Sequence, residues 1–184
     1  MSSSQFAQAP AIAAPTVSSS FEIRVIGSVR TPWRRREDAP HQPTAALDAK
    51  GVLEIDAAYR PALADLGSFD RAWLLFLFHR SRGWAPTVKP PRGGPKRGVL
   101  ATRAPNRPSQ IGLTCVRLEA VDVSRGLVEV RDVDLLDGTP LLDVKPYLPT
   151  TDAWPEAGHG WLEPYLAAGI EPKLKKPYRP PRAE

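Results

Sequence analysis

The chain has 184 residues and a formal net charge of +5 at pH 7, a length that predicts a single domain. Its 21 prolines favour many turns over long helices. Cys115 is the single cysteine, which excludes an internal disulfide and fits a reducing compartment. The sequence has no apolar run near the roughly 18 residues that cross a bilayer and no secretory signal pattern, so we expect a cytoplasmic protein.

Positive charge is unevenly distributed along the chain. Between Arg71 and Leu118 the sequence has ten Lys or Arg residues and no Asp or Glu. A stretch of this kind indicates a polyanionic partner, because it leaves a surface without carboxylates to repel phosphate groups.

The first half of the chain predicts strands separated by turns. Met1–Ser20 is rich in Ala, Ser and Pro without periodicity, which predicts a disordered segment. Apolar and polar residues then alternate over Phe21–Val29, as in a strand with one buried face. Gly51–Ile55 is a second short strand, and Tyr59–Leu66 has the spacing of a short helix. The aromatic-rich run Phe69–His79 predicts a buried strand.

The second half continues this pattern. Gly98–Leu118 opens with a short apolar run, turns through a proline-stiffened loop and closes on a strand. Ala120–Val123 and Leu127–Val133 flank a turn and predict a β-hairpin. A turn leads into a strand at Leu141–Val144, and Trp161–Ala168 has the composition of a short helix.

About seven short strands without βαβ alternation predict an all-β chain, an antiparallel barrel or sandwich. We divide it into a disordered segment (1–20), a β-domain (21–152) and a C-terminal extension (153–184). The extension ends in the basic, proline-rich stretch Lys173–Arg182. The sequence has no GxGxxG after a strand, no CxxC or HExxH, and no nucleophile elbow, so neither a Rossmann cofactor site nor a metal site is expected.

Three basic loops are candidate binding segments. The loop with Arg103 and Arg107 is either an anion clamp or a solvated hairpin loop. In Ser81–Arg97, cations surround Trp84, a pattern that suits phosphate contact and base stacking, with a solvated loop as the alternative. Arg34–Arg36 has the same two interpretations. The predicted nucleic-acid contacts are Arg82, Trp84, Lys89, Arg92, Lys96, Arg97 and Arg107.

Four motifs in order carry a family resemblance: WLLFLFHR, GWAPTVKPPRGG, ATRAPNRPSQIGLTCVRL and DLLDGTPLLDVKPYLP. Together they resemble the TsaA-like family of tRNA methyltransferases (the TrmO, YaeB and VirR-like group) from about Phe21 to Asp152. The resemblance implies a single antiparallel β-barrel that binds S-adenosylmethionine and forms homodimers with the cofactor near the subunit interface. It also implies N6-methylation of threonylcarbamoyl-adenosine at position 37 of tRNA, beside the anticodon.

The same resemblance implies the site residues. A cation at Arg103 suits the cofactor's carboxylate, and Asp132 or Asp134 suits its hydroxyls or amino group. For acceptor positioning we select Asp137, Lys145 and Tyr147, and an adenine could stack on Trp84 or Tyr147. The implied cofactor contacts are Pro40, His41, Gln42, His79, Arg80, Arg103, Leu113, Asp132, Val133 and Asp134.

The chain departs from the family pattern at three places. Ala104 replaces a serine, Ser109-Gln110 replaces Asn-Pro, and His41 replaces an arginine. Two other functions therefore stay open: methyl transfer to a different acceptor, or S-adenosylmethionine binding without catalysis in a regulatory protein. Methylation of tRNA that lacks threonylcarbamoylation would favour the first, and cofactor binding without turnover would favour the second. A purely structural barrel is the third alternative.

Overall fold

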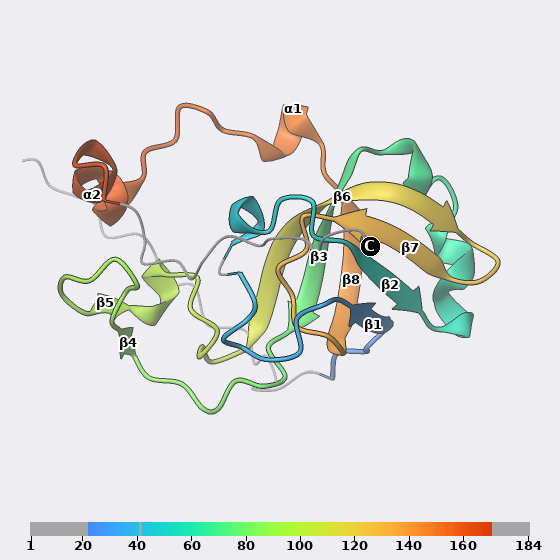
Figure 1. The fold of residues 1–184 in the computed structure, drawn as a ribbon, viewed down its shortest axis with the longest axis horizontal. Coiled ribbons are helices and arrows are strands. Elements are labelled where there is room, and N and C mark those ends of the chain that lie inside the picture. Colours follow the sequence, from blue (N-terminus) through green and yellow to red (C-terminus); the bar gives the residue numbers. More distant parts are fainter. Residues whose placement is uncertain (1–21, 41, 171–184) are drawn as a thin grey trace, which may run out of the picture.

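A computed structural model describes residues 22–40 and 42–170. Six strands close into an antiparallel barrel in the order β1–β2–β7–β6–β3–β8, which confirms the predicted fold class (Figure 1). Closure pairs both edges of this sheet, so the barrel itself has no edge strand. The strands are β1 (Gly27–Arg30), β2 (Gly51–Ile55), β3 (Arg71–Leu77), β6 (Ile111–Asp122), β7 (Leu127–Arg131) and β8 (Thr139–Pro146).

The barrel forms because apolar residues recur at every second position of its strands. In β3, Ala72, Leu74 and Phe76 are buried and alternate with partly exposed neighbours. The side chains of Leu74, Leu53 and Leu141 come from three strands and are fully buried in one core. Burial of leucines of this kind contributes about 2 kcal/mol each to folding.

The remaining elements are short. They are the 3-10 helices η1 (Pro43–Ala45), η2 (Ala57–Leu63), η3 (Leu66–Ser68), η4 (Val99–Ala101) and η5 (Gly160–Leu162), the α-helices α1 (Pro149–Asp152) and α2 (Glu163–Ala167), and the two-stranded ribbon of β4 (Thr87–Val88) and β5 (Arg97–Gly98). In the described part of the chain no helix is long and apolar enough to cross a membrane.

Several predicted boundaries differ from the structure. The first strand begins at Gly27, and the predicted Phe21 and the segments 1–20 and 171–184 lie outside the described residues. The apolar run after Gly98 is a 3-10 turn rather than a strand, because Thr102 Oγ1 donates a hydrogen bond back to the Val99 carbonyl at 2.8 Å. β8 is twice as long as predicted and includes two prolines, Pro140 and Pro146.

The described part of the C-terminal extension, residues 153–170, packs beside the ribbon rather than on the barrel (Figure 1). Trp161 Nε1 donates a hydrogen bond to the Ala101 carbonyl at 2.8 Å, and the Arg97 guanidinium lies 5.1 Å from the centre of the Trp161 ring. Arg92 Nε donates to the Ile170 carbonyl at 3.1 Å. Aromatic and backbone contacts therefore hold η5 and α2 against the basic loop.

Strand alternation decides where the loops meet. β1, β7 and β3 run in one direction and β2, β6 and β8 in the other. The segments that follow β1, β3 and β7 therefore lie at the same end of the barrel as those that precede β6 and β8. This end, which we call the loop end, carries most of the predicted site residues.

Candidate functional site

The segment after β1 is anchored at the loop end by a buried tryptophan. Trp33 Nε1 donates a hydrogen bond to the Val133 carbonyl at 2.9 Å, and the Trp33 carbonyl accepts one from the Asp137 amide at 2.8 Å. The Thr31 amide donates to Asp137 Oδ1 at 3.2 Å. These bonds fix residues 31–40 against the segment between β7 and β8.

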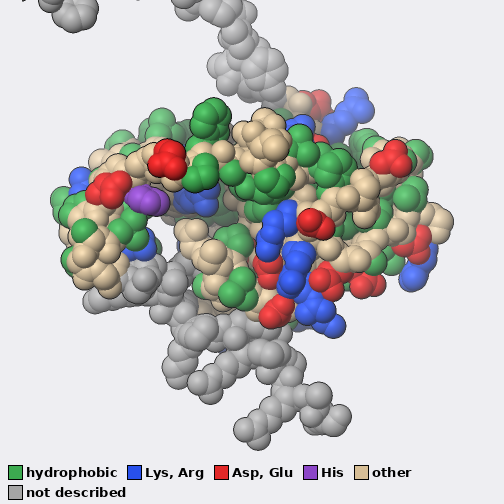
Figure 2. Space-filling model, turned by 90° about the horizontal axis from the view of Figure 1, so that it is seen from above, with side chains coloured by type: hydrophobic (Ala, Val, Ile, Leu, Met, Phe, Trp, Pro, Cys, Tyr) green, Lys and Arg blue, Asp and Glu red, His purple; other side chains and the backbone are tan. Residues whose placement is uncertain are grey.

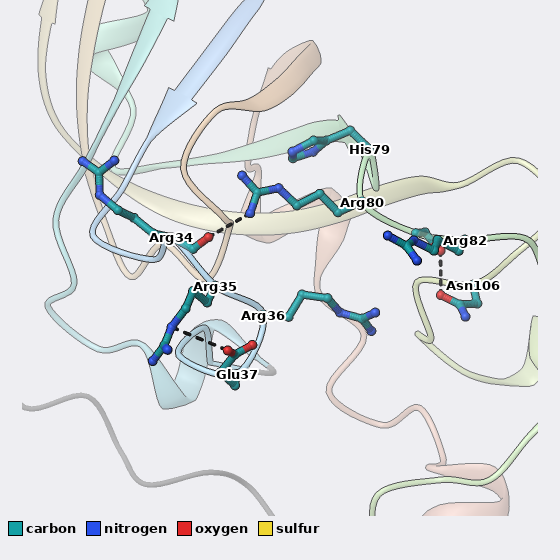
Figure 3. A pocket seen from close by; sticks show the side chains of 9 residues that line it. Arg34, Arg35, Arg36, Glu37, His79, Arg80, Arg82 and Asn106 are labelled. Carbon is teal, nitrogen blue, oxygen red and sulfur yellow. Dashed lines mark hydrogen bonds and ion pairs between the residues drawn. The ribbon is translucent and has the colours of Figure 1, made fainter.

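A cavity of about 710 Å³ opens between three loop-end segments, those after β1, after β3 and before β6 (Figure 3). Arg80 Nη1 donates to the Arg34 carbonyl at 2.8 Å and so joins the segment after β3 to the one after β1. Ser81 Oγ donates to Asn106 Oδ1 at 2.6 Å and joins the same segment to the loop before β6. The lining residues are Arg34, Arg35, Arg36, Glu37, His79, Arg80, Ser81, Arg82 and Asn106.

The cavity is strongly electropositive, since five arginines and one carboxylate line it. Burial lowers the pKa of His79 and the charge of Arg80 acts in the same direction, so this imidazole is less readily protonated than an exposed one. Elsewhere charges are mixed: Figure 2 shows a face on which basic and acidic side chains lie interleaved.

Arg103 lies within electrostatic range of Asp134, although the two residues are far apart in the sequence. Asp134 Oδ1 accepts a hydrogen bond from Thr114 Oγ1 at 2.9 Å. Burial raises the pKa of the Asp134 carboxyl to about 6, against the opposing effects of the Thr114 hydrogen bond and the positive charge of Arg103. A partly desolvated carboxylate within electrostatic range of a guanidinium can hold a ligand with charges of both signs.

Asp132 has a different environment from Asp134. Its side chain is almost fully buried, and Oδ2 accepts a hydrogen bond from Arg71 at 3.1 Å while Oδ1 accepts one from the Asp48 amide at 3.0 Å. Arg117 lies 3.7 Å from the same carboxylate. Both oxygens of Asp132 therefore hold the fold together, whereas the second oxygen of Asp134 makes no side-chain hydrogen bond in the described chain.

The other predicted cofactor contacts have mixed surroundings. Leu113 is 51% exposed, and its neighbours in β6, Gly112 and Thr114, are buried. Since successive residues of a strand face opposite sides, the Leu113 side chain points outward from the barrel. Val133 is fully buried, and the Gln42 carbonyl accepts the first hydrogen bond of η1. Pro40 is partly buried beside this turn, and His41 lies outside the described residues.

The three residues selected for acceptor positioning do not lie together. Asp137 precedes β8 at the loop end, with Oδ2 3.7 Å from Arg34 Nη1. Lys145 pairs with Asp143 at 2.8 Å, and the Tyr147 ring packs on Trp73 at 5.6 Å. We expected all three near one site, but β8 separates them: the strand is roughly 23 Å long, with Asp137 before its start, Lys145 near its far end and Tyr147 just after it.

The predicted nucleic-acid contacts divide into two groups. Trp84, Lys89 and Lys96 are exposed, and Arg82 lines the cavity. Arg107 instead donates to the Thr102 carbonyl at 3.0 Å and braces its own loop. Arg92 and Arg97 contact the C-terminal extension, as described above. For Arg34–Arg36 the sequence allowed either phosphate contact or a solvated loop. The run of three arginines directly after Trp33 was the feature that indicated phosphate contact.

Comparison with known proteins places this geometry in context. Residues 28–153 match the family model of the tRNA-methyltransferase O N-terminal domain. The chain is similar to a probable S-adenosyl-L-methionine-binding protein of Pyrococcus abyssi, 41% identical over 76% of this chain and 75% of the relative. It is also similar to the tRNA (adenine(37)-N6)-methyltransferase of Escherichia coli, 39% identical over 82% of this chain and 67% of that protein.

Solved structures give the same result. The crystal structure of TrmO from Pseudomonas aeruginosa superposes with a TM-score of 0.65 at 37% identity over 77% of this chain. The chain spans 62% of the length of that structure.

Proposed function

The chain belongs to the family of the tRNA-methyltransferase O N-terminal domain, and on that basis we propose that it is an S-adenosylmethionine-dependent tRNA methyltransferase. The proposed reaction is N6-methylation of threonylcarbamoyl-adenosine at position 37. The observation that carries the proposal is the partly desolvated carboxyl group of Asp134 at the loop end, which lies within electrostatic range of the exposed Arg103. A site with one cation and one anion matches a cofactor that has a carboxylate and an ammonium group on the same carbon.

The residues present fit this cofactor. Arg103 would hold the carboxylate, and Asp134 would accept hydrogen bonds from the ammonium group or from ribose hydroxyls. His79 and Arg80 border the same end of the barrel. When bound, the cofactor supplies a methyl group activated by a sulfonium. The protein's part in a displacement of this kind is to align the acceptor nitrogen with that methyl group, and positioning supplies most of the catalysis.

Proton transfer places few demands on the protein. The proton on N6 of the acceptor leaves after the new bond has made the nitrogen acidic, so a strong base is not required. Asp137 lies at the loop end and is positioned by the Thr31 amide at 3.2 Å. We assign Asp137 to acceptor positioning and leave Lys145 and Tyr147 without a role in the same site.

The proposed substrate region is the anticodon loop, which presents unstacked bases. Exposed Trp84 offers a surface on which a base can stack, and Lys89 and Lys96 on the same loop can contact phosphates. The protein would act on tRNA in the cytoplasm.

We also propose that the chain forms a homodimer. Ile111 and Leu113 are 36% and 51% exposed on the outer surface of β6. Exposed apolar residues on adjacent outward positions are suited to an interface. A variant with both residues changed to glutamate should be monomeric in light scattering, while the unchanged protein should be a dimer.

The test of the proposed reaction uses purified protein, a methyl-labelled cofactor and two tRNA pools, one with and one without threonylcarbamoyl-adenosine. Nucleoside mass analysis should detect methylated threonylcarbamoyl-adenosine in the first pool only. Methylation in both pools would indicate a different acceptor. Cofactor binding with no methylation in either pool would indicate a regulatory protein.

A further inference from the structure

We propose that the cavity at the loop end contains a clamp for RNA phosphates, formed by Arg36 and Arg82, next to the residues assigned to the cofactor. The inference rests on the proposed function and assigns part of its substrate contact. It gives a role to the Arg34–Arg36 segment.

The charge of the cavity favours a polyanion over the cofactor as the ligand of Arg36 and Arg82. S-adenosylmethionine carries one carboxylate, one ammonium and one sulfonium, a net charge of +1. A cavity lined by five arginines and one glutamate repels such a ligand and attracts a polyanion. The acidic group suited to the cofactor, Asp134, is not among the lining residues.

The five arginines are not equivalent. Arg34 lies 3.7 Å from Asp137, and Arg35 Nε donates to Asp38 at 2.8 Å. Arg80 donates to the Arg34 carbonyl. The side chains of Arg36 and Arg82 alone among the five make no hydrogen bond or ion pair with the described residues. Their guanidinium donors are therefore available to a ligand.

The first three arginines fix the positions of the two available ones. The Arg80 hydrogen bond ties the segment of Arg82 to the segment of Arg36, and the Arg35–Asp38 pair at 2.8 Å closes a turn next to Arg36. Figure 3 shows the Arg36 side chain extending toward the loop that carries Asn106. Arg36 and Arg82 thus line one cavity from opposite segments, an arrangement that can contact neighbouring phosphates of one RNA strand.

The test compares two double variants of equal charge. In R36Q/R82Q both proposed phosphate contacts are removed. In the control R24Q/R125Q two exposed arginines outside the cavity are changed. Binding of unfractionated tRNA is measured by fluorescence anisotropy over a range of salt concentrations, and S-adenosylmethionine binding is measured by calorimetry.

We expect R36Q/R82Q to bind tRNA about 10- to 100-fold more weakly than the control, with a salt slope lower by about 1.5 because two phosphate contacts are lost. Its affinity for S-adenosylmethionine should stay within about twofold of the unchanged protein. Equal tRNA binding by the two variants would overturn the proposal, and so would a selective loss of cofactor binding in R36Q/R82Q. Because the readout is binding, a protein that clamps tRNA in this way but methylates none would contradict the proposed reaction and leave the clamp supported.

Discussion

Replacement of Asp134 by asparagine separates the cost of this carboxylate to folding from its use in cofactor binding. Burial raises the pKa of Asp134 from the ordinary 3.8 to about 6, so the ionised group destabilises the folded state above pH 6. A difference of this size corresponds to about 3 kcal/mol. The amide oxygen introduced by D134N would still accept the hydrogen bond from Thr114 Oγ1. Because the acceptor would be uncharged, this hydrogen bond would stabilise the fold by about 1 kcal/mol less.

The expected net effect is that D134N is about 1–2 kcal/mol more stable than the unchanged protein at pH 7. Between pH 4 and pH 6 the folded protein binds more protons than the unfolded chain, so its stability falls as the pH rises through this range. D134N lacks this contribution. The advantage of the variant should therefore fall to zero or slightly below as the pH is lowered to 4.

Urea unfolding of both proteins at pH 4, 5, 6 and 7 measures this difference, since the other titrating groups are common to both. The same variant should bind S-adenosylmethionine at least about tenfold more weakly at pH 7, because it lacks the anion for the ammonium group. If D134N were the less stable protein at pH 7, or if its stability advantage did not change with pH, the buried carboxylate would not have this cost.

Three further substitutions test the account of the fold. Asp132→Ala removes a buried partner of Arg71 and should destabilise the protein by about 3 kcal/mol in urea unfolding. Asp48→Ala is the matched control, because Asp48 has the same φ of 64° as Asp132 but an exposed side chain. Equal losses of stability in the two variants would show that backbone strain, and not the buried ion pair, accounts for the effect. Gly112→Ala places a Cβ against the Phe76 ring and should destabilise the protein by about 2 kcal/mol. In the control Gly98→Ala the new Cβ lies in open space, so thermal unfolding should show a lower melting temperature for Gly112→Ala only. Trp161→Ala removes the hydrogen bond to Ala101 and should make the extension sensitive to trypsin. The free energy of unfolding of the barrel should stay within about 0.5 kcal/mol of its original value. A destabilised barrel would show that the extension and the barrel do not unfold independently.

Local pattern predicted an antiparallel all-β fold, either a barrel or a sandwich, and the family resemblance selected the barrel. Strands such as β3 alternate buried and exposed residues so regularly that their type follows from the sequence. The 3-10 turn at Val99–Ala101 was missed because its apolar composition is also that of a strand, and the Thr102 hydrogen bond becomes evident only in three dimensions. β8 was underestimated because prolines usually end strands, yet Pro140 and Pro146 lie within it.

The site was less predictable because it depends on which side chains find partners. Asp132 and Asp134 are two residues apart, and only the fold shows that the first is held by Arg71 while the second lies within electrostatic range of Arg103. Similarly, nothing local distinguishes Arg36 from Arg35. The distinction arises from Asp38, which pairs with Arg35 in the structure.

We propose that Arg103 and Asp134 form the binding site for S-adenosylmethionine at one end of the barrel. Calorimetric titration of the cofactor into the unchanged protein and into R103Q, with R24Q as the control, tests it directly. We expect saturable binding that R103Q weakens at least about tenfold and R24Q leaves intact. Absence of binding heat for the unchanged protein, or equal affinity in R103Q and R24Q, would contradict it.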